Sequence, residues 1–147
     1  MTLPNLFIVG AAKSGTTSLH NYLNQHPDIF MCQPKEPHFL INREIGANRI
    51  PIGISDFKDY QDLFSQGGSF RYRGESSVMY LLYHDIVIPK IKELFGKQTK
   101  IIIMLRNPIE RAYSGFHHVK RYNIKEDENF ETAWEICEER YCSNQNM

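Results

Sequence analysis

The stretch FIVGAAKSGTTSLHNYLNQHP, residues 7–27, decides the fold of this chain. The apolar run over residues 6–9 predicts a buried strand that ends at Gly10. The apolar spacing over residues 14–25 predicts a helix that Pro27 ends. A glycine-rich turn between a strand and a helix gathers unpaired N–H groups at the positive end of the helix dipole. The stretch therefore predicts a site for an anion such as a phosphate group.

The lysine of this loop stands in a different place from that of ATPases and GTPases. Gly10 and Gly15 keep the glycine spacing of the pattern G-x-x-x-x-G-K-[ST], which cradles nucleotide phosphates. The residue after Gly15 is Thr16, however, and the lysine is Lys13, inside the loop. The apolar run IIIML ends in Arg106 and not in the metal-binding aspartate of those enzymes. A P-loop kinase or NTPase is therefore disfavoured, and no metal is expected. Two interpretations of the loop remain: another kind of phosphate site, or a plain glycine turn with a solvated lysine.

The overall composition narrows the class of protein. The 147 residues contain 17 Lys and Arg and 17 Asp and Glu, so the net charge of zero argues against a nucleic-acid-binding protein. The three cysteines, Cys32, Cys137 and Cys142, lack metal-ligand spacing and are expected to be free thiols in a reducing compartment. The sequence shows no signal peptide and no apolar run of about 18 residues. We therefore expect a cytoplasmic protein without a membrane span.

Buried strands that alternate with helices predict an α/β fold, a P-loop-like parallel sheet with flanking helices. Further strands are predicted at residues 29–31, 70–75 and 100–105, and helices at residues 55–64, 88–95, 107–120 and 129–141. The segment IIIML is the clearest buried strand, and residues 32–54 are predicted to be loop. We expect a single domain over residues 1–147, the N-terminal portion of a larger fold, because no strand is predicted after residue 105.

Four segments resemble those of sulfotransferases that use 3′-phosphoadenosine-5′-phosphosulfate (PAPS). FIVGAAKSGTTSL, residues 7–19, is similar to the loop that binds the 5′-phosphosulfate, and IIIMLRNPIERAYSGFHH, residues 101–118, to the 3′-phosphate-binding segment. KEPHFL, residues 35–40, resembles the segment with the catalytic glutamate of heparan-sulfate-type and many bacterial members. GESSVMYL, residues 74–81, resembles the stretch G-E-x-[ST]-P-x-Y. The resemblance implies sulfuryl transfer from PAPS to an acceptor hydroxyl, on a carbohydrate by preference or on a small molecule.

Sulfuryl transfer needs a cation at the departing phosphate oxygen, N–H donors for the phosphate and a base for the acceptor hydroxyl. The residues that the resemblance assigns are Lys13, Ser14, Gly15, Thr16 and Thr17 for the 5′-phosphosulfate, Arg106 and Ser114 for the 3′-phosphate, and Glu36 as the base. Lys13 would also act in catalysis, at the leaving oxygen. His38 is the alternative base, because histidine has that role in the cytosolic branch of the family.

The sequence leaves the protonation of Glu36 open. The neighbouring Lys35 would lower the pKa of this carboxyl, whereas burial would raise it. A solvated loop glutamate without a catalytic role is the structural alternative.

Two features depart from the family pattern. Heparan-type members carry a catalytic lysine in the segment that matches residues 75–80, whereas here Glu75 is followed by Ser76, and Val78 replaces the usual proline. The family fold also takes roughly twice this length, within the ordinary size of an α/β domain. A truncated, non-catalytic protein that binds PAPS or its product is therefore the alternative function. Self-association, or pairing with a missing C-terminal segment, is the expected way of completing the fold.

Overall fold

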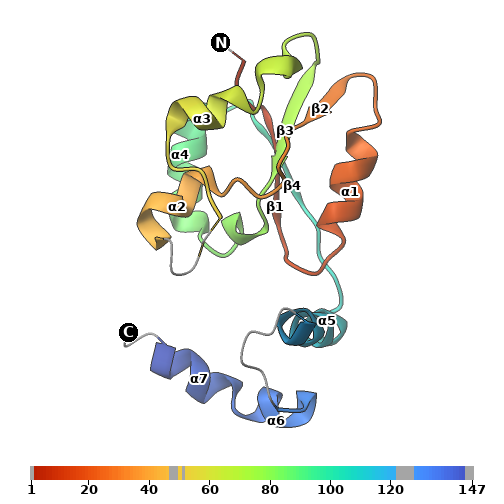
Figure 1. Ribbon diagram of the computed structural model, residues 1–147, viewed down its shortest axis with the longest axis vertical. Helices are drawn as coiled ribbons and strands as arrows, with labels where there is room; N and C mark the ends of the chain where they lie inside the picture. The colour runs from red at the N-terminus through yellow and green to blue at the C-terminus, as the bar shows by residue number, and fades with distance from the viewer. Residues whose placement is uncertain (1, 47–49, 51, 122–127, 145–147) are drawn as a thin grey trace. The chain divides into compact units, whose positions relative to one another are not determined.

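A parallel sheet with strand order β2-β3-β1-β4 forms the centre of the protein (Figure 1). The computed structural model describes residues 2–46, 50, 52–121 and 128–144, and divides into two compact units, Met1–Arg106 and Asn107–Met147. The strands of the first unit are β1 (Leu6–Gly10), β2 (Ile29–Met31), β3 (Tyr72–Ser76) and β4 (Lys100–Ile103). β1 pairs in parallel with both β3 and β4, and β2 pairs in parallel with β3. The predicted parallel sheet is confirmed.

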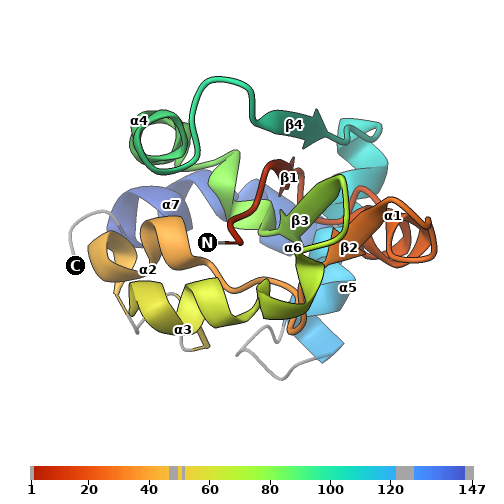
Figure 2. The same ribbon diagram turned by 90° about the horizontal axis from the view of Figure 1, so that it is seen from above.

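Helices cover both faces of this sheet. In the first unit they are α1 (Thr16–Leu23), α2 (Phe39–Ile45), α3 (Phe57–Asp62) and α4 (His84–Leu94), with the short 3₁₀ helices η1 (Ser65–Gly67) and η2 (Val78–Tyr80). Figures 1 and 2 show α1 on one side of the sheet and α2, α3 and α4 on the other. This arrangement is the α/β layering that the alternating pattern predicts.

The central strand β1 divides its side chains between two hydrophobic clusters. Phe7 and Val9 belong to the cluster that includes buried residues of α2 and α4. Leu6 and Ile8 belong to the cluster against which α1 packs its leucines. Successive side chains of a strand point to opposite faces, so a fully apolar strand fits only between two covered faces. The burial of the whole of β1 follows from this position.

Two helices differ from the sequence prediction, one in its existence and the other in its start. Residues 32–54 were expected to be loop, but α2 forms within them because Leu40 and Ile41 are completely buried in the core. The helix predicted from residue 88 begins at His84, and Pro89 lies inside it. Val87, in the part that the sequence pattern missed, is 2% exposed. Burial against the sheet, which the local sequence does not record, therefore decides where both helices form.

The strand with the sequence IIIML is an edge strand and is not buried, contrary to the sequence prediction. β4 pairs with β1 along one side and has no strand on its other side among the described residues. Ile101 is 45% exposed and Ile103 is 53% exposed. An apolar run therefore marks the strand correctly but does not say how much of it other elements cover.

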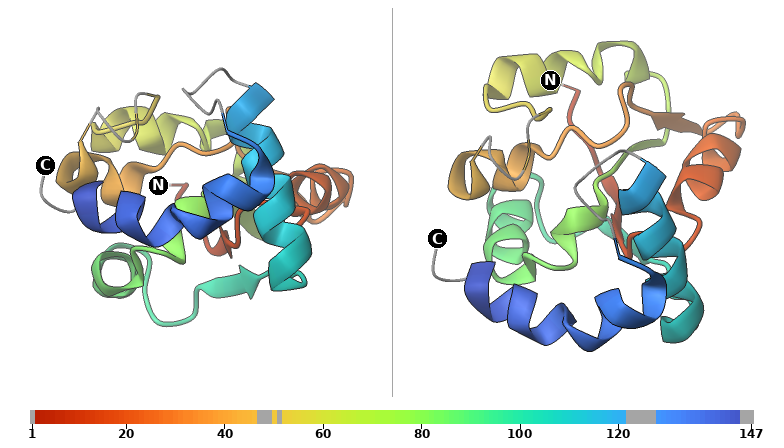
Figure 3. Two further views of the ribbon diagram at one scale, coloured as in Figure 1. Left: turned by 90° about the horizontal axis from the view of Figure 1, so that it is seen from below. Right: turned by 60° about the horizontal axis from the view of Figure 1, so that its bottom comes forward.

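The second unit is helical over its described residues, with α5 (Pro108–Arg121), α6 (Phe130–Glu135) and α7 (Cys137–Asn144). The Asn107 side chain accepts hydrogen bonds from the N–H groups of Ile109 and Glu110 at 3.0 and 3.4 Å, which confirms the predicted helix start. The helix predicted over residues 129–141 is two helices that meet at Ile136 (Figure 3). Among the described residues, no helix is long and apolar enough to cross a membrane.

Candidate functional site

The loop between β1 and α1 requires its first glycine. Gly10 has a φ of +150°, and a Cβ atom on it would lie 2.9 Å from Leu81 Cβ and 3.0 Å from the carbonyl oxygen of Val78. The Gly10 carbonyl accepts a hydrogen bond from Met104 N at 2.7 Å, and Ala11 N donates to Met104 O at 2.8 Å. The loop is thus fixed on one side to the segment that follows β4 and on the other to η2.

The start of α1 has the form of an anion cradle. Gly15 is the N-cap with a φ of +89°, and no side chain caps the helix. The first N–H groups of the helix, at Thr16 and Thr17, have no partner within it. Ser14 Oγ is buried and has no hydrogen-bond partner among the described residues. An uncapped helix start beside an unpartnered buried hydroxyl suits the oxygens of a phosphate or sulfonate group.

The structure brings one of the residues predicted for the 3′-phosphate to this loop. Arg106 donates a hydrogen bond from its guanidinium group to the carbonyl oxygen of Lys13, at 3.4 Å. The two residues are 93 positions apart in the chain. Ser114 lies in α5, in the second unit, so its proposed place at the 3′-phosphate stays a prediction.

The end of β3 holds the segment that carries the candidate base. Glu36 N donates to the carbonyl oxygen of Ser76 at 3.0 Å, and His38 N donates to Ser77 Oγ at 3.2 Å. The two side chains meet, since Glu36 Oε2 lies 3.3 Å from His38 Nε2. The other carboxylate oxygen of Glu36 pairs with the ammonium group of Lys35. The best base candidate and its alternative therefore belong to one cluster.

The ionisation of Glu36, which the sequence left open, is settled by its partners. Partial burial acts to raise the pKa of the carboxyl. The hydrogen bonds from His38 and Lys35, together with the charge of Lys35, outweigh that effect and lower the pKa to about 2. Glu36 is accordingly a carboxylate at neutral pH and can accept a proton.

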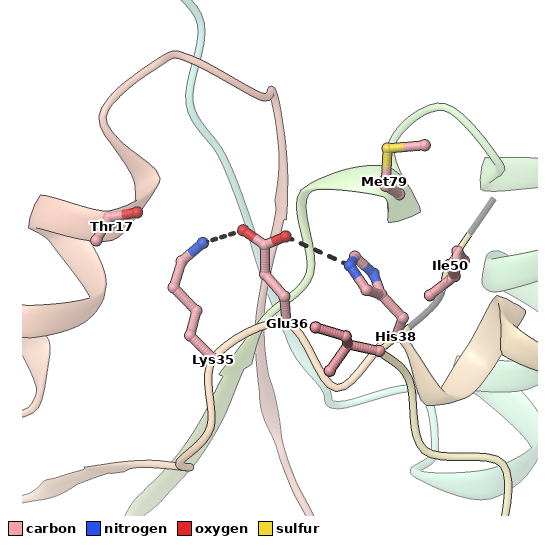
Figure 4. A pocket seen from close by; sticks show the side chains of 7 residues that line it. Thr17, Lys35, Glu36, His38, Ile50 and Met79 are labelled. Atoms are coloured by element: carbon pink, nitrogen blue, oxygen red, sulfur yellow. Dashed lines mark hydrogen bonds and ion pairs between the residues drawn. The ribbon is translucent and has the colours of Figure 1, made fainter. Parts of the chain in front are cut away.

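A pocket of about 450 Å³ joins this cluster to the anion cradle (Figure 4). Its lining residues are Thr17, Lys35, Glu36, His38, Ile50, Ile52 and Met79. Figure 4 shows Glu36 between Lys35 and His38, with Thr17 of α1 on the side of Lys35. Three of the sequence segments that resemble the family, at residues 7–19, 35–40 and 74–81, thus line the same pocket.

The candidate catalytic residues share an uncommon backbone conformation. Among the described residues, three that are not glycine have a φ in the left-handed region: Lys13 at 64°, Glu36 at 64° and His38 at 51°. This conformation is unfavourable for residues with a Cβ atom and is concentrated at functional sites. The coincidence supports the choice of these three residues.

Sequence reasoning missed the polar contacts beneath the pocket. Buried His20 lies with Nδ1 2.9 Å from Ser76 Oγ and with Nε2 3.2 Å from the Gln33 side-chain amide. Burial, helped by the charge of Lys35, lowers the pKa of His20. These contacts join α1, the segment after β2 and the end of β3. No spacing signal connects the three positions, so the sequence alone offered no way to find them.

The residue before Ser76 in β3 is a buried carboxyl, Glu75. The Glu75 side chain is completely buried, and burial raises its pKa to about 7 although nearby Tyr80 and Tyr60 act to lower it. Neither carboxylate oxygen has a hydrogen-bond partner of good geometry among the described residues, so burial is the dominant effect. Across the described part of the chain, no group of three or more His, Cys, Asp or Glu side chains could hold a metal ion.

This protein has a P-loop-like α/β fold. Helices flank a parallel sheet, and the anion loop lies at the C-terminal end of its central strand β1. A family model described as "Sulfotransferase domain" matches residues 3–146. The chain therefore belongs to the sulfotransferase domain family.

Curated and solved proteins agree with this membership. Carbohydrate sulfotransferase 15 of Mus musculus is 26% identical over 169 residues, which cover 90% of this chain and 30% of that protein. The bifunctional heparan sulfate N-deacetylase/N-sulfotransferase 2 of Homo sapiens is 30% identical over 120 residues, 82% of this chain and 13% of that protein. The crystal structure of a sulfotransferase from Alicyclobacillus acidocaldarius matches with a TM-score of 0.82 and 36% identity, over 97% of this chain and 60% of that one. The chain spans less than a third of the length of these curated relatives.

Proposed function

We propose that this chain binds PAPS and transfers its sulfuryl group to an acceptor hydroxyl. The observation that carries the proposal is the pocket in which Thr17, at the start of the uncapped helix α1, and the carboxylate of Glu36 line one space. A donor held at the helix start would present its sulfur toward the base. The names of the relatives refer to carbohydrate and heparan sulfate, which favours a carbohydrate acceptor over another small molecule.

The loop residues supply the donor contacts in this proposal. The N–H groups of Gly15, Thr16 and Thr17 and the unpartnered hydroxyl of Ser14 hold the 5′-phosphosulfate. Lys13 provides the cation for the oxygen that bridges phosphorus and sulfur. Arg106 and Ser114 hold the 3′-phosphate, for which an arginine fork is suited. The proximity of Arg106 to the loop supports its part of this assignment.

Glu36 acts as the base for the acceptor. In the proposed step, the oxygen of the acceptor hydroxyl forms a bond to sulfur, the bond between sulfur and the bridging phosphate oxygen breaks, and Glu36 takes the hydroxyl proton. The electron pair of the broken bond stays on the phosphate oxygen, where Lys13 stabilises the growing negative charge. The products are a sulfate ester and adenosine 3′,5′-bisphosphate.

His38 has a supporting role in this mechanism. Its Nε2 lies 3.3 Å from Glu36 Oε2, so a proton on Nε2 makes His38 a hydrogen-bond donor to the base. A residue that donates to the carboxylate holds it in place and does not compete for the acceptor proton. We therefore assign the base role to Glu36 and the orienting role to His38.

Calorimetric titration tests the donor assignment. We expect binding of adenosine 3′,5′-bisphosphate and none of ATP with magnesium. Binding of ATP with magnesium but not of the bisphosphate would instead indicate a nucleotide kinase or an NTPase. An assay of transfer from PAPS to a panel of oligosaccharides then separates the two remaining functions, because binding without transfer would favour the non-catalytic alternative.

A further inference from the structure

Lys35 is a cationic side chain that lines the pocket, and the mechanism proposed above gives it no role. Its side chain is only 17% exposed, although lysine side chains normally extend into solvent. The ammonium group points along the pocket, paired with Glu36 on the side that faces Thr17 (Figure 4). A lysine held in this way lies between the anion cradle and the base.

The chemistry of an ammonium group allows more than this one contact. Lysine has three N–H donors, so Lys35 can hold the Glu36 carboxylate and a second anionic acceptor at the same time. The pocket is also lined by apolar side chains, among them Ile50 and Met79, which reduce the competition from water. The group that fits beside Lys35 is therefore a compact anion that enters from the direction of Thr17.

We propose that Lys35 binds the sulfonate oxygens of the donor while it holds Glu36, and so places the base next to the sulfur atom. This inference rests on the proposed function. It distinguishes two cations by position: Lys13 in the loop serves the bridging oxygen, and Lys35 serves the non-bridging oxygens of the group that moves. Lys35 is a specificity-determining residue in this arrangement, because it contacts only the part of the donor that the product lacks.

The arrangement also couples the base to the donor. Without an anion beside it, the whole charge of Lys35 faces Glu36 and weakens the carboxylate as a base. A sulfonate next to the same ammonium group offsets part of that charge, and the carboxylate becomes a better proton acceptor. Glu36 would thus gain basicity at the moment when the sulfur is in place.

The chain offers a matched control for this lysine. Lys90 forms the same type of ion pair with Glu44, with its side chain 30% exposed, and it does not line the pocket. Lys90→Ala removes a lysine–glutamate pair outside the proposed donor site, together with the 2.7 Å hydrogen bond from Lys90 Nζ to the carbonyl oxygen of Leu40. A difference between Lys35→Ala and Lys90→Ala therefore reports on the pocket and not on ion pairs in general.

The test compares two nucleotides that differ only in the sulfonate. Calorimetry with PAPS and with adenosine 3′,5′-bisphosphate is performed on the wild type, Lys35→Ala, Lys35→Arg and Lys90→Ala, each checked by a melting curve. We expect Lys35→Ala to lose on the order of tenfold or more in affinity for PAPS, the size of a lost charged hydrogen bond, and less than about twofold for the bisphosphate. Lys35→Arg should recover part of the loss, and Lys90→Ala should change neither affinity.

Three outcomes would overturn the inference. An equal loss for both nucleotides in Lys35→Ala would show that the residue supports the fold or the 5′-phosphate, and an unchanged affinity for PAPS would show that the sulfonate does not reach it. If the wild type bound neither nucleotide, the proposed function itself would fail. Wild-type binding of the bisphosphate with no effect of Lys35→Ala would leave the proposed function intact and reject only the role of Lys35.

Discussion

The side chains of Lys13, Glu36 and His38 stand on backbone that only glycine adopts easily. The side chain of a residue in the left-handed conformation points in a different direction from those of helical or extended neighbours. A loop can therefore direct a single side chain into a pocket. The Glu36 carboxylate thereby meets two hydrogen-bonding partners, and these partners keep it ionised at neutral pH. The chemistry at this scale therefore depends on local backbone conformation as much as on residue type. Substitutions of single residues test the roles that we propose.

Replacement of Lys13 by alanine should reduce the rate of transfer far more than the affinity for nucleotide. The proposed contact with the bridging oxygen strengthens as that oxygen becomes charged, so its loss should lower kcat on the order of 10²-fold or more. Single-turnover kinetics and calorimetry on Lys13→Ala measure the two effects separately. A variant with near-normal turnover would show that the loop lysine does not serve the leaving group.

Arg106→Ala should weaken the binding of nucleotides that carry a 3′-phosphate. The expected cost is roughly 1.5–3 kcal/mol, the value of a hydrogen bond to a charged group. Titration of adenosine 5′-phosphate provides the comparison, because this nucleotide lacks the 3′-phosphate and should bind almost as it does to the wild type. An equal loss for both nucleotides would reject the assignment of Arg106.

Glu36→Gln keeps the shape of the side chain but cannot take the acceptor proton. We predict a nucleotide affinity within about threefold of the wild type and a transfer rate reduced by ~10²–10⁴, as is typical for the loss of a general base. His38→Ala should have a smaller effect on the rate, because His38 only orients the carboxylate. If the effects of the two substitutions were exchanged, the histidine would be the base.

At the scale of the elements, the sequence predicted the strands better than the helices around the site. An apolar run such as residues 6–9 is enough to locate β1, because burial on both faces demands it. The helix α2 was missed, since its formation depends on distant partners: the Tyr80 hydroxyl accepts a hydrogen bond from Leu40 N at 3.2 Å. The loop was predicted from local pattern and Glu36 from the family resemblance, whereas the contact of Glu36 with His38 required the fold.

The strand β3 contains a buried carboxyl whose ionisation should affect the free energy of unfolding near neutral pH. The pKa of Glu75 is about 7 in the folded protein, above the ordinary value of 4.5, so its contribution to stability is complete below about pH 4.5 and is lost as the pH rises through 7. The loss is on the order of 3 kcal/mol, since one pH unit corresponds to about 1.4 kcal/mol. Glu75→Gln cannot ionise and should remove this part of the pH dependence of the free energy of unfolding.

Urea titrations at several pH values between 4.5 and 8.5 measure this effect. Glu93→Gln, at an exposed position of α4, is the control and should follow the wild type. His20, whose pKa is lowered, acts in the opposite direction below pH 6.5, so the difference between the wild type and Glu75→Gln is the decisive quantity. Parallel curves for these two proteins would show that Glu75 does not titrate in this range.

At the scale of the whole molecule, the edge strand β4 is the feature that the sequence described least well. The apolar pattern predicted a buried strand, but a strand is buried only when another element covers it, and coverage is a property of the complete arrangement. In the structure, the side chains of Ile103 and Leu105 are 53% and 78% exposed. An edge with unpaired backbone groups and apolar side chains favours pairing with another strand.

We therefore predict that the isolated chain associates with itself through β4. Multi-angle light scattering should show species larger than 17.2 kDa at micromolar concentrations, and Ile103→Lys should shift them toward the monomer, because a charge at an edge opposes strand pairing. Tyr22→Lys, at an exposed apolar position of α1, is the control and should leave the association unchanged. A monodisperse wild-type monomer would reject the prediction.

The hydrogen bonds that the end of β3 makes with the segment after β2 have a consequence for motion. Cys32 N bonds to the carbonyl oxygen of Gly74 at 2.9 Å, and Glu36 N bonds to that of Ser76 at 3.0 Å, so the segment with the base continues the ladder of the sheet without being a strand. The amide hydrogens of Cys32 and Glu36 exchange with solvent only when these hydrogen bonds open. We therefore expect the base to open together with the end of β3 and not as a separate flexible loop. Heat should then remove the catalytic geometry and the fold in a single cooperative event.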